Sequence, residues 1–339
     1  MKALCYSAFG SSPFVWKPSA NIPKVWRGGV LIKVAGSSTN HFDYFISKIV
    51  PARLILNGWP CGFDVSGTVV ACAPDVKTFS VGDRVFGFGQ GFAEYATTRA
   101  WLITKIPDTM EDTSRMGMYP SVGVTALQML NQYWFDRPNP DRVSRVVIVG
   151  ASGGVGSSLI QLIRAKCERP VSIIAVSSGK NEEYCRSLGA TEFIDYSKLE
   201  GRLSRQIAEG SVDLIFDTVS GNFGTGIDYV SDGLPLLNAD GVYVSTNSIR
   251  IMDYVRKLSK WLLGRATFSG GVQNQKFELF MINLFRSQKD LKEIAQYVKD
   301  KKFELKPSEI LEFDEKNLRS ALNKMETRHQ VGKLHVKIV

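Results

Sequence analysis

A glycine-rich turn is the stretch of this sequence whose residue types and spacing best suit chemistry. Residues 150–156 are Gly-Ala-Ser-Gly-Gly-Val-Gly, directly after the apolar run 146–149 and before a helical pattern. Glycine at the fourth and seventh places lets the backbone approach a pyrophosphate, and the first N–H groups of the helix bind its oxygens. The flanking strand and helix favour a dinucleotide site over a merely structural turn. Its predicted contacts are Ser152, Gly153, Gly154 and Val155.

The loop after the next apolar run indicates which dinucleotide this site takes. An NAD site usually carries Asp or Glu there, which accepts hydrogen bonds from the ribose 2′-hydroxyl. Residues 171–180 contain no acid and end in a loop that holds Ser177, Ser178 and Lys180. Hydroxyls and an ammonium suit a 2′-phosphate, which a carboxylate would repel. The sequence therefore predicts NADPH as the cofactor. The alternative is an ordinary polar loop with Lys180 in solvent.

The surrounding pattern indicates the elements that must position this turn. Near-continuous apolar strands alternate with longer helical stretches between about residue 119 and residue 265. The expected strands are 146–149, 171–176, 193–194, 212–216 and 241–244. Such strands, separated by helices, predict a parallel sheet covered on both faces. Residues 1 to about 118 instead hold short β-rich runs broken by Gly, Pro and Ser, and a last strand is expected at 334–339.

Length and composition agree with a two-domain globular protein. The chain has 339 residues, of which 44% are hydrophobic and 22% charged. These values exclude wholesale disorder, a collagen-like repeat and a disulfide-dense mini-protein. The net charge of +9 asks for an anionic partner. Five cysteines without a C-x-x-C pair argue against a structural zinc site and favour a reduced, cytoplasmic setting. We also expect no signal peptide and no membrane-spanning segment.

Several ordered motifs carry a resemblance to a known family. They are the Asn-x-x-Asp stretch within 37–43, the P-x-G-x-D-x-x-G pattern at 60–67, and the segments 81–87, 91–96, 122–128, 150–156, 188–190, 194–196 and 213–219. With these motifs over essentially its whole length, the chain resembles the medium-chain dehydrogenase/reductase superfamily, specifically the zinc-free quinone oxidoreductase (zeta-crystallin-like) branch.

The resemblance implies an architecture and an oligomeric state. Residues 1–118 plus 266–339 would form a GroES-like, mostly β substrate domain. Residues 119–265 would form a Rossmann domain, a doubly wound parallel α/β sheet that binds NADPH and is inserted in the first. Relatives are commonly dimers, so a homodimer is expected, with the strand near 243–245 extending a sheet across the two-fold axis.

The resemblance also bears on metal and reaction. The positions that hold catalytic zinc in zinc-dependent relatives are here Asn40, Phe63-Asp64 and Ser121, which are poor replacements for thiolate and imidazole ligands. We therefore expect no metal. Without a Lewis acid an alkoxide is hard to stabilise, whereas hydride addition to a conjugated carbonyl spreads its charge. The expected function is a zinc-independent, NADPH-dependent reductase of quinones or α,β-unsaturated carbonyls that acts by direct hydride transfer.

Three residues are carried over as catalytic candidates. Asn40 would lie near the nicotinamide ribose and the substrate carbonyl and donate through its amide, the alternative being a turn-capping Asn. Asp64 would orient its neighbours rather than transfer protons. Relatives often have an aromatic hydroxyl where this chain has Phe45, so Tyr44 beside it is the candidate that remains. Asp43 is expected to have a structural hydrogen-bonding role.

On the cofactor side the resemblance implies four further contacts. Thr125 would reach the pyrophosphate or nicotinamide region. Tyr196 would lie on the adenosine side, Arg328 would reach the 2′-phosphate from the C-terminal segment, and Lys333 would contact the cofactor near the end of the chain. The alternatives for the last three are a packing tyrosine and solvated surface charges.

One basic segment is not explained by the cofactor. Residues 249–265 carry five basic residues and one acid, with aromatic and apolar residues interleaved at roughly helical spacing. The segment suits peripheral contact with an anionic membrane surface, or an amphipathic helix packed beside the implied cleft. A second function therefore stays open, that of an NADPH-binding protein with little turnover that acts in interaction or regulation. Nucleic-acid binding is disfavoured because no concentrated Arg/Lys tract or RNA motif is present.

Overall fold

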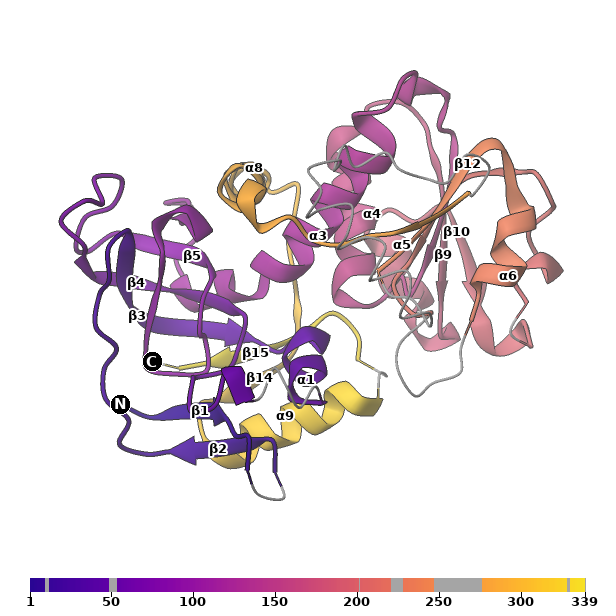
Figure 1. Ribbon diagram of the computed structural model, residues 1–339. Helices are drawn as coiled ribbons and strands as arrows, with labels where there is room; N and C mark the ends of the chain where they lie inside the picture. The colour runs from indigo at the N-terminus through magenta and orange to yellow at the C-terminus, as the bar shows by residue number, and fades with distance from the viewer. Residues whose placement is uncertain are drawn as a thin grey trace. The chain divides into compact units, whose positions relative to one another are not determined.

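The computed structural model describes residues 1–9, 12–48, 54–200, 202–220, 228–246, 276–327 and 330–338. The chain divides into two compact units (Figure 1). Unit 1 consists of Met1–Val124 and Asn283–Val339, and unit 2 is Thr125–Ile282. The first passage between units falls inside helix α3 (Pro120–Leu130). The boundary expected at 265/266 lies outside the described residues.

Unit 2 contains a parallel sheet of six strands in the described part of the chain. The strands are β8 (Arg145–Val149), β9 (Ser172–Ser177), β10 (Glu192–Asp195), β11 (Val212–Asp217), β12 (Leu237–Ser245) and β13 (Phe277–Leu279). Their order is β10-β9-β8-β11-β12-β13, and every neighbouring pair is parallel. This is the doubly wound Rossmann order, with the change of direction between β8 and β11. The predicted fold of this domain is confirmed.

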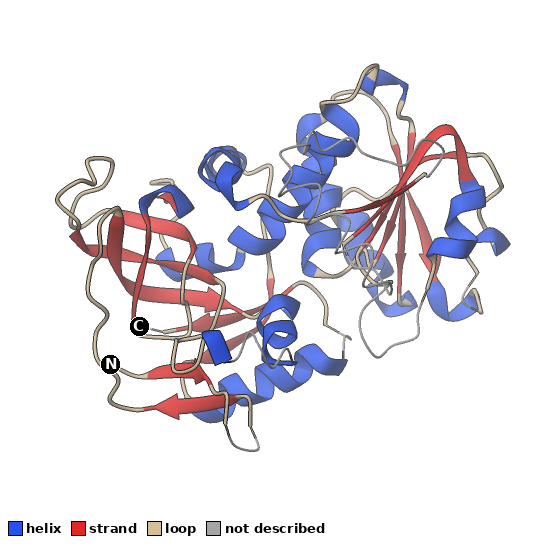
Figure 2. Cartoon of the chain, viewed as in Figure 1, coloured by secondary structure: helices blue, strands red, loops and turns tan. Residues whose placement is uncertain are grey.

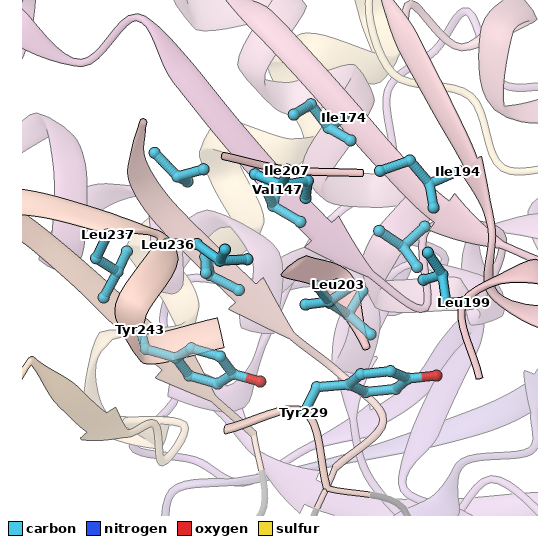
Figure 3. Packing of buried hydrophobic residues seen from close by; sticks show 14 residues of the cluster. Val147, Ile174, Ile194, Leu199, Leu203, Ile207, Tyr229, Leu236, Leu237 and Tyr243 are labelled. Carbon is cyan, nitrogen blue, oxygen red and sulfur yellow. The ribbon is translucent and has the colours of Figure 1, made fainter. Parts of the chain in front are cut away.

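The strands of unit 2 form because apolar residues run through them almost without interruption. Val147, Ile174 and Ile215 are fully buried in one cluster, in which the rings of Tyr229 and Tyr243 lie beside aliphatic side chains (Figure 3). Apolar strands of this kind need cover on both faces. Helices accompany the sheet (Figure 2). They include α4 (Gly154–Lys166), α5 (Glu182–Ser187) and α6 (Val230–Gly233).

Unit 1 is built on a mostly antiparallel sheet. Its strands are β3 (Gly29–Ser38), β4 (Asp64–Cys72), β5 (Arg84–Phe88), β6 (Tyr95–Arg99), β7 (Ile103–Lys105), β14 (Pro307–Glu312) and β15 (Lys333–Lys337), beside a small pair, β1 (Ala3–Tyr6) and β2 (Phe14–Lys17). The C-terminal β15 pairs with the N-terminal β3, with His335 opposite Ser38 (Figure 1). The two ends of the chain thus complete one sheet, as expected for a GroES-like domain interrupted by an insertion.

Several α-helices and short helices complete unit 1, and the π-helical η3 (Asn131–Phe135) belongs to unit 2. The α-helices are α1 (His41–Lys48), α8 (Ser287–Lys299) and α9 (Glu315–Thr327), and the short helices include η1 (Ala100–Leu102), η2 (Thr113–Met118) and η9 (Leu284–Arg286). Among the described residues, none of the helices has the length and apolarity needed to cross a membrane.

One expectation about strand positions is wrong. Residues 243–245 were expected to extend a sheet across a dimer axis, but β12 is hydrogen-bonded on both sides. It pairs with β11 through Val244↔Phe216 and with β13 through Val244↔Glu278. A strand with two neighbours has no free edge for a third. In the described sheet the edge belongs to β13, a strand of three residues that the sequence pattern did not reveal.

Candidate active site

The glycine-rich turn follows β8 at the point where the direction of the sheet connections changes. Gly150 has φ +81°, in the left-handed region, and a Cβ there would lie 2.3 Å from Oγ1 of Thr218. A Cβ at Gly156 would lie 2.2 Å from the carbonyl oxygen of Gly150. Both positions therefore need glycine. Gly153 is the N-cap of α4, and no side chain caps the helix. The turn thus fits a pyrophosphate bound at a helix N-terminus.

Two of the serines expected at the cofactor lie behind this turn. The hydroxyl of Ser177 donates to Oγ of Ser152 at 2.7 Å, and Nδ2 of Asn181 reaches the same oxygen at 3.0 Å. Ser152 and Ser177 are 6% and 3% exposed. Their hydroxyls therefore brace the turn against the loop after β9. Asn181 was missed in the sequence, where it is one polar residue in a polar loop.

The residues at the surface of the same sheet edge are Ser178, Lys180 and Tyr196. Ser178 is half-buried, Lys180 is exposed, and the side chain of Tyr196 is 37% exposed. They follow β9 and β10, whose ends are paired through Asp195↔Ser177. A shallow hollow of about 650 Å³ adjoins Lys180. Its lining consists of Gly179, Lys180, Glu182, Glu183, Arg186 and Ser187.

A carboxylate from outside residues 171–180 also reaches this loop. A Cβ at Gly179 would lie 2.5 Å from Oδ2 of Asp195, which comes from the neighbouring strand β10. Hydrogen bonds from the hydroxyl and the N–H of Ser197 lower the pKa of Asp195, so the carboxylate stays ionised. The loop after β9 therefore has an acid beside it, although none lies within residues 171–180.

A buried acid and a tyrosine fix the loop after β11. Oη of Tyr243 donates to Oδ2 of Asp217 at 2.5 Å, and both residues are fully buried. Oδ1 of Asp217 accepts the N–H groups of Val219 and Ser220 at 2.8 and 3.0 Å. Burial raises the pKa of Asp217 and of the Tyr243 hydroxyl. The loop held in this way carries Thr218 against Gly150.

In unit 1 the candidate residues gather around the carboxylate of Asp64 at the start of β4. Its Oδ2 accepts Oγ–H of Ser38 at 2.7 Å and Nδ2–H of Asn40 at 2.9 Å. Its Oδ1 accepts both the N–H and the hydroxyl of Ser121, at 2.8 and 2.5 Å. Asp64 is 0% exposed. The carboxylate thus ties together the end of β3, the start of α1 and the start of α3.

Lys333 joins the same cluster from β15. Its Nζ donates to the carbonyl oxygen of Thr39 at 2.8 Å and to Oδ1 of Asn40 at 2.7 Å, and it lies 3.6 Å from Oδ2 of Asp64. The residue is 3% exposed, so the alternative of a solvated surface charge is wrong. Burial lowers the pKa of Lys333, and the charges of Asp64 and Asp43 oppose that effect. The ammonium is an internal cation of unit 1.

The contacts of Asn40 correct its expected role as a hydrogen-bond donor to substrate. Nδ2 donates to Asp64 and reaches the carbonyl oxygen of Ser38 at 3.4 Å, while Oδ1 accepts from Lys333. Both hydrogens of the amide and its oxygen are therefore engaged within the protein, and the residue is 7% exposed. In this arrangement Asn40 connects Asp64 to Lys333 and orients the chain at the start of α1.

Asp43 is the second acid of this cluster. Its Oδ2 accepts the N–H of Asn40 at 2.9 Å, and Oδ1 is buried without a hydrogen-bond partner among the described residues. The side chain is 1% exposed. Burial, together with the charge of Asp64, raises the pKa of Asp43 to about 7. The carboxyl of Asp43 therefore holds its proton at higher pH than an exposed aspartate does.

The remaining candidates are less closely joined to these clusters. Tyr44 is half-buried on α1, and Nζ of Lys48 lies 4.6 Å from the centroid of its ring. Thr125 is half-buried in α3. Arg328, the side chain of Phe45 and the basic segment 249–265 lie outside the described residues.

Comparison with known proteins assigns the family. The model of the family "Alcohol dehydrogenase GroES-like domain" matches residues 27–108, and that of "Zinc-binding dehydrogenase" matches residues 188–336. The mitochondrial NAD(P)H oxidoreductase RTN4IP1 of Bos taurus is 30% identical over 283 residues, which cover 74% of this chain and 70% of that protein. This chain belongs to the medium-chain dehydrogenase/reductase superfamily. It lies in the quinone-oxidoreductase-like branch, as its motifs indicated.

Two further relatives of this dehydrogenase/reductase are quinone oxidoreductases by name. The chloroplastic quinone-oxidoreductase QR1 of Triphysaria versicolor is 30% identical over 232 residues, which cover 65% of this chain and 68% of that protein. The solved structure of the quinone oxidoreductase from Coxiella burnetii covers 100% of this chain and 99% of its own, with a TM-score of 0.78 at 24% identity. The latter comparison supports the fold, a GroES-like domain with a Rossmann domain.

One family model is named for zinc, but the residues at the zinc positions of this dehydrogenase/reductase do not fit that metal. Asn40, Asp64 and Ser121 are engaged with one another and with the Lys333 ammonium, which a Zn²⁺ ion would repel. At the remaining position the Phe63 ring packs 4.9 Å from that of Phe42 and 5.3 Å from that of Phe88. Among the described residues, no group of three or more His, Cys, Asp or Glu is placed to hold a metal ion.

Proposed function

We propose that this protein is an NADPH-dependent reductase of quinones or α,β-unsaturated carbonyls that transfers hydride directly and uses no zinc. The single observation that carries the proposal is that Asn40, Asp64 and Ser121, at positions where zinc-dependent relatives bind their metal, form a closed hydrogen-bond network with the Lys333 ammonium. The dinucleotide-binding turn of unit 2 supplies the other requirement. The names of the quinone oxidoreductase relatives agree with it.

The chemistry follows from what the residues of each unit offer. A bound nicotinamide supplies the hydride. The turn at 150–156 would hold the pyrophosphate through backbone N–H groups, and Lys333 holds the amide of Asn40 in one orientation. The exposed Phe42 ring, in edge contact with Phe63, offers an apolar surface to a flat conjugated substrate. A conjugated carbonyl accepts hydride with delocalised charge, so it needs no Lewis acid.

The preference for NADPH rests on Ser178 and Lys180, which offer a hydroxyl and an ammonium at the end of β9. Asp195 works against it, because an ionised carboxylate beside Gly179 repels a 2′-phosphate. We expect the cation to prevail, because Lys180 is exposed and its side chain can turn toward the phosphate.

Fluorescence titration with NADPH and NADH measures the preference. Lys180→Gln should weaken NADPH binding about 10- to 150-fold and leave NADH binding unchanged, as expected for loss of a charge-assisted hydrogen bond of about 1.5–3 kcal/mol. Asp195→Asn should strengthen NADPH.

The proposal extends to the assembly and the setting. A homodimer would form through the β13 edge of the unit 2 sheet, since β12 has no free edge. The five cysteines are free, which suits the reducing cytoplasm. Size-exclusion chromatography with light scattering tests the dimer. Phe277→Pro in β13 should shift it to monomer if the edge is the contact, because the alternate residues Lys276 and Phe280 make the backbone hydrogen bonds to β12.

Decay of NADPH absorbance with a panel of quinones, enones and simple alcohols tests the function. We expect turnover with quinones or enones and none with simple alcohols. Tight NADPH binding without turnover on any member of the panel would overturn the reductase proposal and favour a cofactor-binding role in interaction or regulation.

A further inference from the structure

A stacked pair of aromatic rings lies at the surface of unit 1. The rings of Trp101 in η1 and Phe285 in η9 are 5.6 Å apart between centroids and 15° from parallel. Their exposed fractions are 39% and 74%. The two short helices are fastened through Gln288 at the start of α8, whose Nε2 donates to the carbonyl oxygen of Ala100 at 3.2 Å. The rings thus form a fixed apolar platform open to solvent.

A third exposed aromatic residue, Trp26, adjoins this platform through Arg99. Its guanidinium lies over the ring of Trp26, 6.0 Å from the centroid, and Nη1 donates to the carbonyl oxygen of Arg27 at 2.8 Å. Trp26 is 38% exposed. The N–H of Ala100, next to Trp101, donates to the carbonyl oxygen of Gly28 at 3.0 Å. The loop with Trp26 therefore lies beside η1, and the two aromatic sites belong to one surface.

The charge of this surface is positive. Arg27 and Arg99 are exposed, and α8, which begins two residues after Phe285, carries exposed Lys289 and Lys292 on its first turns. Three acids lie near these groups. Asp75 lies 3.5 Å from Arg27, Asp290 is 0% exposed, and half-buried Glu293 accepts a hydrogen bond from the Tyr297 hydroxyl at 3.2 Å. We call this set the aromatic–basic surface. Its members are Trp26, Arg27, Arg99, Trp101, Phe285, Lys289 and Lys292.

We propose that the aromatic–basic surface docks on an anionic lipid bilayer. Tryptophan and phenylalanine rings beside cations are the composition that binds at a lipid headgroup layer, where rings enter the acyl boundary and basic groups meet phosphates. Each basic residue near such a surface adds about 1 kcal/mol. A nucleic acid, whose bases stack on aromatic rings, is the other anionic partner with these requirements, and an oligonucleotide is therefore an arm of the test. The proposal is independent of the redox reaction and of the segment 249–265.

Sedimentation of the full chain with vesicles tests it, with phosphatidylcholine alone compared with phosphatidylcholine containing phosphatidylglycerol. We expect binding to the anionic vesicles only. Lys289→Gln with Lys292→Gln should lower the partition coefficient about 30-fold, because two contributions of about 1 kcal/mol are removed. The matched control is Ile310→Ser with Lys316→Gln, two exposed residues of β14 and α9, which should bind as the wild type does.

A variant that keeps an aromatic ring makes the test independent of folding. Brominated lipids quench tryptophans at the bilayer, so wild-type fluorescence should fall when anionic brominated vesicles are added. Trp101→Phe should lose part of that quenching and Trp26→Phe with Trp101→Phe most of it, while both variants still sediment with the vesicles.

Three results would overturn the proposal. The first is no binding to anionic vesicles, including the case in which the chain binds an oligonucleotide instead. The second is binding that the paired Lys variants leave unchanged, which would place the contact elsewhere on the chain. The third is a change of oligomeric state in those variants without a change in vesicle binding, which would make the surface an interface between copies.

Discussion

Replacing Lys333 by methionine tests whether the polar cluster of unit 1 is held together by its buried cation. The substitution keeps the length of the side chain and removes the ammonium that Thr39 and Asn40 accept from. It leaves Oδ1 of Asn40 without its donor and Asp64 with no cation 3.6 Å away. Removal of one partner from a buried charge pair typically costs about 3–5 kcal/mol. We expect Lys333→Met to lower the free energy of unfolding of unit 1 by that amount.

Hydrogen exchange of the amides in β3 and β15 measures the effect in unit 1 alone, because the two units need not unfold together. Lys337→Met is the matched control, since Lys337 is exposed on the same strand. Its effect should stay within about 0.5 kcal/mol. Adding Asp64→Asn to Lys333→Met should cost about 0.5–3 kcal/mol less than the sum of the single changes, because the two residues interact.

Equal exchange rates in Lys333→Met and Lys337→Met would refute the reasoning, as would strict additivity with Asp64→Asn. Either result would mean that the hydrogen bonds of the ammonium contribute no net stability, and the network could then not be what orients Asn40.

Three further substitutions test the dinucleotide-binding turn, the buried acid Asp43 and the loop after β11. Gly156→Ala places a Cβ 2.2 Å from the carbonyl oxygen of Gly150, so denaturation should show a loss of about 1–3 kcal/mol in the free energy of unfolding. Cofactor titration should show dinucleotide binding at least 10-fold weaker. Unchanged affinity would contradict the predicted site. The pKa of Asp43 is raised from 3.8 to about 7, so between these values the folded state binds a proton that the unfolded state has lost. The free energy of unfolding should therefore fall by up to about 1.4 kcal/mol per pH unit from about pH 4 to pH 7. Urea titrations at several pH values should show that Asp43→Asn removes this contribution. Tyr243→Phe removes a hydrogen bond from buried Asp217 and should cost about 1–3 kcal/mol in urea denaturation, whereas a neutral effect would show that the acid is satisfied by Val219 and Ser220 alone.

The fold could be predicted from the sequence because its signals are local. The run before Gly150 is apolar at every position, the glycines follow it directly, and later strands repeat the pattern at intervals that a helix fills. The edge of the sheet was not predictable in this way. It is set by β13, a strand of three residues that acquires its partner only in the folded chain.

The members of the polar cluster in unit 1 were named from the sequence, but the directions of their hydrogen bonds were not predictable. Asn40, Asp64 and Lys333 were named from the sequence, yet nothing in it states that β15 lies against β3, which is what buries the lysine beside the amide. In this buried position the Asn40 amide donates to Asp64 and accepts from Lys333. In the same way the acid near the cofactor loop belongs to β10 rather than β9, so a search within residues 171–180 could not find Asp195.

Transfer of deuterium from NADPH that carries deuterium at both positions of nicotinamide C4 is the most direct measurement of hydride transfer. The labelled cofactor is mixed with an enone or a quinone and with protein that a chelator has freed of metal. Mass spectrometry then measures the deuterium content of the product. Direct hydride transfer without zinc predicts full deuterium incorporation into the enone product, at a rate that added zinc does not raise. Loss of activity on chelation with recovery on added zinc, or reduced enone without deuterium, would contradict the account.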